Sequence, residues 1–328
     1  MNSPLLSILV PIYQTETEAL RLVEAWRRVN SSAIELILLL DGKSNQRSLF
    51  ENHESGGHLR LLQHDENQGL AQARMSLSQA ARGKYLWHHD ADDLPNLQHV
   101  DRVLGILARS DEDILEFNAE MQRGATSKPL YATIKSQFLR AQSELTLTTI
   151  QHQYIAQNIW NKLIRREFWN EATSRINEET DLKFTLAEDL FYCHLLLNKH
   201  CTYKFYNIYI YHYLQNEASS TRNFSSDRIQ RNFNEITLAF DNIEKLIDID
   251  ANSRDRLNFQ KAANLYYSCI RGRVDIEACL ELEHCPEIPS TVRTALQQAI
   301  TDLSGTFRVT RERLIRKKPH LGWLHRSN

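Results

Sequence analysis

Three aspartates lie within four residues of the segment YLWHHDADDLPN, directly after an apolar and aromatic run. They are Asp90, Asp92 and Asp93. Like charges this close repel one another, so the cluster needs a compensating partner. Mg²⁺ and Mn²⁺ favour one or two carboxylates together with phosphate oxygens and water. The cluster therefore predicts a cation site, with the alternative that Asp93 caps the next helix and the others face water.

Alternating apolar runs and helical patterns place this cluster at the end of a strand. The strand-like runs are residues 6–13, 34–42, 59–65, 84–90 and 113–121. The helical patterns between them are residues 17–29, 44–54, 69–83 and 96–110. Short apolar strands joined by helices predict an α/β fold with a mostly parallel sheet and helices on both faces. Ligands bind at the carboxyl ends of such strands, where Tyr13, Asp41 and the aspartate cluster are expected.

The second half of the chain has a looser pattern. Residues 157–171 and 187–199 favour helices, and the aromatic run 203–215 favours a strand. From about residue 227 the pattern is mainly helical. Residues 307–328 contain seven Lys or Arg and one Glu, with apolar side chains between them. Such a basic tail suits an anionic membrane surface, and a solvated helix end or an oligomer contact are the alternatives.

Composition narrows the class of protein. The 328 residues carry a formal net charge of −2, which gives no global signal for nucleic-acid binding. Five cysteines without a CxxC pair favour reduced thiols over a disulfide framework or a zinc site. The N-terminus lacks the pattern of a signal peptide, and no apolar run approaches the ~20 residues that span a bilayer. We expect a cytoplasmic protein, with peripheral contact at the inner face of the membrane as an extension.

Four short motifs, in this order, resemble the family 2 glycosyltransferases of the GT-A fold. That family typically shows Pro-x-Tyr-Asn-x-Glu, Asp-Asp-Gly-Ser, Asn-x-Gly-x-x-x-Ala-Arg and Asp-x-Asp. The matching residues here are Pro11, Tyr13 and Glu16; Asp41 and Gly42; Asn67, Gly69, Ala73 and Arg74; and Asp90, Ala91 and Asp92. The resemblance covers about residues 5–120. Departures are Gln14, Leu40 and Lys43, which stand where the family usually has Asn, Asp and Ser.

The resemblance implies a Rossmann-like GT-A domain over residues 1–225. Residues 1–120 would form its nucleotide-sugar half and residues 121–225 its acceptor half, followed by a helical region over 226–328. The implied activity is inverting, metal-dependent transfer of a hexosyl or N-acetylhexosaminyl group from a nucleotide-sugar, expected to be a UDP-sugar. The implied acceptor is a hydroxyl of a surface glycan or lipid-linked glycan, such as lipooligosaccharide or capsule. The resemblance is also compatible with a homo-oligomer.

The resemblance also assigns roles in the donor site. Tyr13 would stack on the base, and Asp41 would accept a hydrogen bond from it. Arg74 would lie beside the base and diphosphate, where a fixed cation suits anionic oxygen. Asp90 would bind the ribose or a metal-bound water, and Asp92 the Mn²⁺ or Mg²⁺ that bridges the two phosphates. The remaining residues implied for this site are Pro11, Glu16, Asn67, Gly69 and Ala91.

Sugar transfer also needs a base for the acceptor hydroxyl. Family members often carry Glu-Asp at a helix start after a Trp-Asn-Lys segment, and the sequence has Glu188 and Asp189 in LAEDLFYC. The resemblance implies Asp189 as the base, with Glu188 either supporting it or contacting the acceptor. The alternative is two acids placed only by the helix dipole. His212 could reach the metal or diphosphate, although a lone histidine among aromatic residues is more often packed in the core.

Two other functions fit some of these residues. An aspartyl-phosphate phosphohydrolase would use Asp90 as nucleophile and Asp92 as acid, but Leu94 stands where Thr or Val is expected. That function would also leave Tyr13 and Arg74 without roles. A non-catalytic nucleotide- or glycan-binding module would leave the acidic pair at residues 188 and 189 unexplained.

Overall fold

The computed structural model describes residues 3–29, 31–51, 59–123, 126–129, 158–214 and 226–248, together with Leu257 and Lys261. The chain divides into two compact units. The first contains Met1–Asn216 and Lys245–Ile247, and the second contains Glu217–Glu244 and Asp248–Asn328. The second unit contains most of helix α8 (Ser226–Leu246). A boundary at residue 225 remains a prediction.

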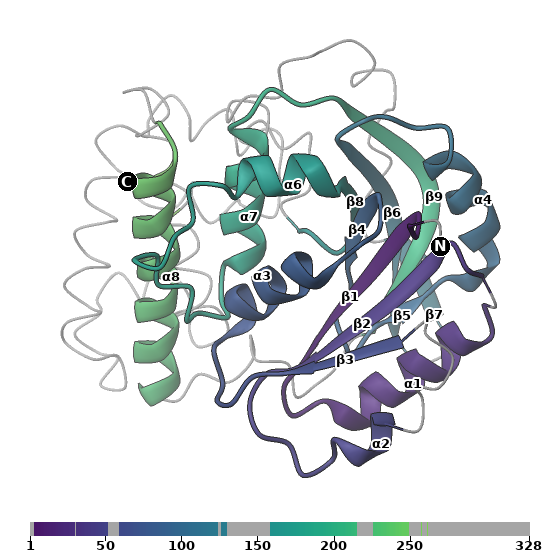
Figure 1. Cartoon of the computed structure of the whole chain (residues 1–328). Coiled ribbons are helices and arrows are strands. Elements are labelled where there is room, and N and C mark those ends of the chain that lie inside the picture. The colour runs from purple at the N-terminus through teal and green to yellow at the C-terminus, as the bar shows by residue number, and fades with distance from the viewer. Residues whose placement is uncertain are drawn as a thin grey trace. The chain divides into compact units, whose positions relative to one another are not determined.

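The N-terminal half forms the parallel part of a sheet. Strands β1 (Leu6–Ile12), β2 (Ile34–Leu40), β3 (Leu59–Gln63) and β4 (Tyr85–His88) lie in the order β3-β2-β1-β4 (Figure 1). All three neighbouring pairs are parallel. Every residue of β1 and β2 is buried. This two-sided burial explains why both strands are apolar apart from Ser7 and Glu35 and show no regular alternation.

Helices cover both faces of this part of the sheet, as expected. Apolar residues of α1 (Glu16–Arg27) and α4 (Val100–Leu107) share a core with Ile8 and Val10 of β1. Helix α3 (Leu70–Ala80) lies on the opposite side (Figure 1). Two shorter elements are α2 (Ser48–Glu51) and the 3-10 turn η1 (Leu97–His99). The helices between the strands of this part are shorter than the sequence pattern indicates.

Helix α3 ends at Ala80 and not at Gly83, where the sequence pattern predicted its end. Gly83 lies beyond the helix, and a Cβ atom there would come within 2.6 Å of the Ser7 backbone nitrogen. The glycine is therefore required because the chain passes close to β1, and not because it terminates a helix.

Beyond β4 the sheet becomes mixed. The added strands are β5 (Leu94–Pro95), β6 (Ile114–Arg123), β7 (Thr126–Pro129), β8 (Lys162–Arg165) and β9 (Tyr203–Leu214). The full order is β3-β2-β1-β4-β8-β6-β9-β5, with β7 beside β6. Strand β8 is antiparallel to both β4 and β6, whereas β6 and β9 are parallel. The parallel sheet expected from the sequence is thus confirmed for β1–β4, and an antiparallel strand extends it.

The helix predicted over residues 157–171 is confirmed only for its last part, which is helix α6 (Arg166–Ala172). Residues 162–165 form strand β8 instead. Leu163 pairs with Trp87 on one side and with Leu115 on the other. Two open strand edges therefore supply the hydrogen bonds of this segment, and tertiary pairing overrides its local helical pattern. The helix predicted over 187–199 is observed as α7 (Glu188–Leu197), and the predicted strand over 203–215 as β9.

Several expectations fall outside the described residues. These are the basic tail and the cysteines at positions 269, 279 and 285. The two cysteines that the structure describes, Cys193 and Cys201, are buried and are not in a disulfide. Within the described ranges, no helix is both long and apolar enough to cross a membrane.

Candidate active site

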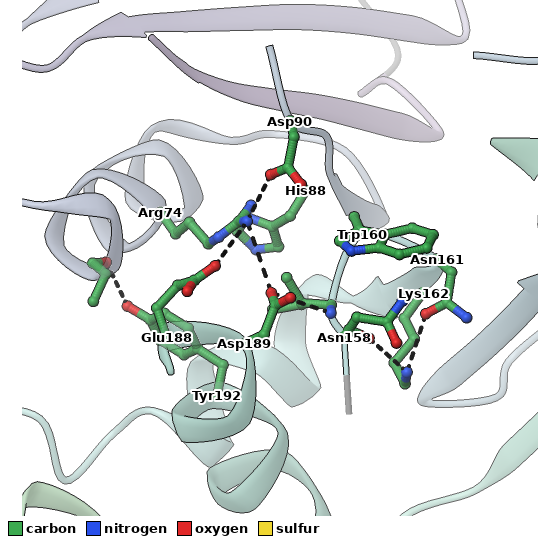
Figure 2. Close-up of polar contacts among 12 residues, drawn as sticks. Arg74, His88, Asp90, Asn158, Trp160, Asn161, Lys162, Glu188, Asp189 and Tyr192 are labelled. Atoms are coloured by element: carbon green, nitrogen blue, oxygen red, sulfur yellow. Dashed lines mark hydrogen bonds and ion pairs between the residues drawn. The ribbon is translucent and has the colours of Figure 1, made fainter. Parts of the chain in front are cut away.

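The guanidinium group of Arg74 joins three carboxylates from distant parts of the chain. Its Nη2 atom lies 2.8 Å from Asp90 Oδ1, 3.2 Å from Glu188 Oε1 and 3.7 Å from Asp189 Oδ1 (Figure 2). The Arg74 side chain is 1% exposed, whereas those of Asp90 and Asp189 are 26% and 27% exposed. The cation is therefore buried beneath acids that reach solvent.

Three elements bring these groups together. Arg74 projects from α3, Asp90 follows β4, and the two acids begin α7. Burial alone would lower the pKa of Arg74, but the charges of the three carboxylates raise it above its usual value. Arg74 therefore stays charged, and its charge is the main compensation for the acids around it.

His88 lies beside this cluster as an uncharged ring. Burial, and then the charge of Arg74, lower its pKa well below the usual value. The ring packs against Trp169 of α6, with centroids 4.7 Å apart. A neutral imidazole avoids a second buried cation next to Arg74.

Both acids of α7 hold protons more tightly than usual. Burial raises the pKa of Asp189 to about 6, the charge of Arg74 opposes this rise, and that of Asp90 adds to it. Burial and the neighbouring charge of Asp189 raise the pKa of Glu188 well above its usual value. A carboxylate with a pKa near 6 is largely ionised at neutral pH and is still able to take up a proton. Asp189 therefore has the properties of a general base.

Asp41 holds a turn against the end of β2. Its Oδ1 atom accepts hydrogen bonds from the Gln68 backbone nitrogen at 2.9 Å and from His64 Nδ1 at 2.7 Å. Its Oδ2 atom accepts one from the Gly69 nitrogen at 3.0 Å. Gly69 has a φ of 86°, and a Cβ atom there would lie 2.8 Å from the Phe184 nitrogen. Asp41 and Gly69 thus shape one connection, which leads from β3 into α3.

Asp93 links the aspartate turn to β9. Its Oδ2 atom accepts a hydrogen bond from Tyr211 Oη at 2.6 Å, and its Oδ1 atom accepts one from the Leu214 nitrogen at 2.7 Å. The predicted alternative, a helix cap by Asp93, is not observed, because Asn96 caps the next turn. Burial raises the pKa of Asp93 to about 8, with the charge of Asp90 contributing.

The residues after β4 fit a divalent cation that is held largely by its substrate. Burial, and then the charge of Asp90, raise the pKa of Asp92, and a cation beside this carboxylate would favour its ionised form. Among the described residues no group of three or more His, Cys, Asp and Glu side chains could hold a metal ion. Mg²⁺ and Mn²⁺ need only one or two carboxylates when a diphosphate supplies further oxygens. Asp92, with Asp90 beside it, meets that requirement.

The other predicted residues are distributed along the strand ends. Tyr13 follows β1 and is 53% exposed. Glu16 Oε1 accepts a hydrogen bond from Ser44 Oγ at 2.8 Å. His212 lies with its Nδ1 atom 3.5 Å from Glu120 Oε2, so it faces β6 and gains no support as a ligand of the metal. Three residues complete the set: Pro11 and Ala91 are buried, and Asn67 is half-buried.

Several supporting residues were not assigned roles from the sequence. They are His64, Glu116, Trp160, Lys162 and Tyr211. Glu116 and Lys162 interrupt buried strands with a charge, which is a signal that sequence reasoning could have used. His64 follows β3, just as Asp41 follows β2. Tyr211 and Trp160 stack with their ring centroids 4.5 Å apart, and nothing in the sequence pairs them.

Residues 7–164 match the family model described as Glycosyl transferase family 2. The matched range contains Asp41, Arg74 and the aspartate cluster. Residues 7–164 are therefore similar to a family 2 glycosyltransferase domain. The resemblance noted in the sequence is thereby confirmed over this range.

Relatives of the family 2 domain agree with this assignment. "Putative glycosyltransferase EpsH" of Bacillus subtilis (strain 168) is 27% identical over 167 residues, which cover 51% of this chain and 48% of EpsH. The chain spans about half the length of the curated relatives it matches.

Two solved structures show the same fold. One is S. aureus TarS 1-349 in complex with UDP-GlcNAc, with a TM-score of 0.60, 16% identity and coverage of 95% of this chain and 92% of TarS. The other is the mannosyltransferase PcManGT from Pyrobaculum calidifontis in complex with GDP-Man and Mn²⁺. It has a TM-score of 0.50, 11% identity and coverage of 93% and 87%. These similarities confirm the expected α/β fold of GT-A type.

Proposed function

We propose that this protein is an inverting, metal-dependent glycosyltransferase that uses a UDP-sugar. The supporting observation is the Arg74 cluster, in which an acid of the donor half, Asp90, and the candidate base Asp189 share one guanidinium nitrogen. Because both acids contact the same nitrogen, Arg74 would fix the position of the base relative to the donor-binding turn. A hexosyl or N-acetylhexosaminyl group would pass to a hydroxyl of a surface glycan or lipid-linked glycan.

Transfer in this site is a single displacement. Asp189 takes the proton of the acceptor hydroxyl while the oxygen of that hydroxyl forms a bond to the anomeric carbon. At the same time the bond from the anomeric carbon to the UDP oxygen breaks. Attack from the side opposite the leaving group inverts the anomeric centre. A metal ion at Asp92 and Asp90 would neutralise charge on the leaving diphosphate. Arg74, whose Nη2 atom lies close to both Glu188 and Asp189, would orient the base.

Asp41 supports uracil as the base. An ionised carboxylate offers about four acceptor positions, and three of those on Asp41 are taken by His64, Gln68 and Gly69. One position on Oδ2 remains for a single donor, such as the imide N–H of uracil. Cytosine has an acceptor nitrogen at that place, so we propose that UDP binds more tightly than CDP. Tyr13, which is exposed, follows Ile12, whose backbone oxygen accepts a hydrogen bond from the Asp41 nitrogen at 2.8 Å. Tyr13 would stack on the base.

Calorimetric titration tests this function. We expect UDP to bind in the presence of Mn²⁺, to bind more weakly with a chelator, and to lose its metal dependence in Asp92→Ala. Asp101→Ala, at an exposed position in the first turn of α4, is the matched control and should bind as the wild type does. UDP release from a panel of UDP-sugars would then identify the donor. Absence of binding by every nucleoside diphosphate under all conditions would contradict the proposal.

The phosphohydrolase alternative has less support. It requires Asp90 as a free nucleophile, whereas Asp90 Oδ1 is 2.8 Å from Arg74 Nη2. Hydrolysis of p-nitrophenyl phosphate that is lost in Asp90→Asn, without any binding of UDP, would favour this alternative.

We also propose that the basic segment 307–328 contacts anionic lipid, since lipid-linked glycans are assembled at membranes. Cosedimentation with phosphatidylglycerol vesicles, but not with phosphatidylcholine vesicles, is the expected result at low salt. Equal sedimentation with both vesicle types, or with neither, would contradict it.

A further inference from the structure

Lys162 and Glu116 form an ion pair that is almost completely shielded from water. Lys162 Nζ lies 3.2 Å from Glu116 Oε2, and the two side chains are 1% and 0% exposed. Burying two charges costs a large desolvation free energy, so such a pair is weak evidence for stability alone. Apolar residues of similar size would serve the core of a sheet at least as well.

Neighbouring polar groups hold the ammonium and the carboxylate in place. Tyr203 Oη donates to Glu116 Oε2 at 2.7 Å, and Asn161 Nδ2 donates to Glu116 Oε1 at 3.3 Å. Lys162 Nζ donates to Asn161 Oδ1 at 3.1 Å. The pair is therefore a hydrogen-bonded unit with a defined position for the Lys162 ammonium group.

Another hydrogen bond of Lys162 leads toward the active site. Lys162 Nζ donates to the backbone oxygen of Asn158 at 2.7 Å. The nitrogen of the same peptide unit belongs to Ile159, and it donates to Asp189 Oδ1 at 3.3 Å. Figure 2 shows Lys162 and Asp189 on opposite sides of this backbone segment. A cation at the carbonyl end polarises the peptide and strengthens donation at its N–H end.

We propose that Lys162 is a positioning residue for the catalytic base, acting on Asp189 through the peptide unit between Asn158 and Ile159. The inference rests on the proposed function, because it takes Asp189 as the base. Lys162 holds the peptide so that its N–H points at Oδ1, which favours ionised Asp189 in one orientation. Glu116 in turn holds the Lys162 ammonium group in position through their ion pair.

Four charged groups face Asp189 from the elements around it. They are Arg74 of α3, Asp90 after β4, Glu188 of α7 and Lys162 of β8. The positive charges of Arg74 and Lys162 favour ionised Asp189, and the two acids oppose it. Loss of the Lys162 charge should therefore move the acidic limb of the kcat profile to higher pH.

The test uses the full chain and a double variant, Lys162→Met with Glu116→Gln. Removing both charges avoids an unpaired buried ion, so this variant should fold with a melting temperature near that of the wild type. We expect kcat for UDP release from the active UDP-sugar to fall about 10- to 100-fold, a part of what a general base contributes. KM for the UDP-sugar should change by less than about twofold, because the donor site is untouched.

A matched control is Arg165→Met with Asp113→Asn, which removes an ion pair from the same strand β8. It should leave kcat, KM and the pH profile unchanged. A folded Lys162/Glu116 double variant with wild-type kcat and pH profile would overturn the inference while leaving the proposed function intact. If the wild type binds UDP but Asp189→Asn keeps full activity, the proposed function itself fails at the base.

Discussion

Tyr211 Oη donates a 2.6 Å hydrogen bond to Asp93 Oδ2 and ties the aspartate turn after β4 to strand β9. The same hydroxyl accepts a hydrogen bond from the Asp90 backbone nitrogen at 3.3 Å. One tyrosine of the second half of the domain thus holds both ends of the turn that carries Asp92. The proposed donor site and the proposed acceptor half are linked at this point.

Tyr211→Phe should loosen the turn without disturbing the core. The phenylalanine ring can keep the stacking on Trp160, but the Asp93 carboxyl loses a buried partner, at a cost of about 1–3 kcal/mol in the free energy of unfolding. We expect KM for the UDP-sugar to rise, and the factor of this rise should be several times larger than the factor by which kcat falls. Urea denaturation and steady-state kinetics measure both effects. Tyr209→Phe, at a half-buried tyrosine on the same strand, is the control, and an equal loss there would refute the link.

The pH dependence of kcat should follow the ionisation of Asp189. Burial raises the pKa of this carboxyl to about 6. A base must be ionised, so kcat should be level above that pH and fall about tenfold for each pH unit below it. A pH profile at saturating donor measures this limb. An acidic limb that persists unchanged in the residual activity of Asp189→Asn would show that another group is responsible.

Arg74→Met should be strongly destabilising. It removes the cation from three carboxylates, and breaking a buried ion pair typically costs about 3–5 kcal/mol in the free energy of unfolding. Thermal or urea unfolding of the purified variant measures the loss. Arg47→Met is the control, since Arg47 and its partner Glu51 are 39% and 52% exposed and such surface pairs contribute about 1 kcal/mol or less. Equal stability of the two variants would contradict the central role of Arg74.

Gly69→Ala should destabilise the fold, whereas Gly105→Ala should not. At position 69 the backbone has a φ of 86° and the new Cβ atom would lie 2.8 Å from a backbone nitrogen. Position 105 lies within α4, and the nearest atom to its new Cβ is the end of the Arg109 side chain at 3.6 Å. We expect a loss above about 1 kcal/mol for the first and a gain of about 0.5–1 kcal/mol for the second. Urea unfolding of both variants decides the comparison.

The sequence determined the parallel half of the sheet and the residues at its carboxyl edge. Runs of buried residues such as β1 and β2 have no polar face, so their apolar pattern alone indicates a covered strand. Tyr13, Asp41 and Asp90 follow strands in the structure as they do in the pattern. These are local features, which depend on the order of side chains along the chain.

Only the tertiary structure decided the segment around Trp160 and the surroundings of the base. Residues 162–165 have an intrinsic pattern compatible with a helix, and they become a strand because β4 and β6 offer unpaired edges on both sides. The contact between Arg74 and Glu188 joins positions 114 residues apart. Neither the raised pKa of Asp189 nor the peptide link to Lys162 has a local signature, because both arise from burial and from charges that folding brings together.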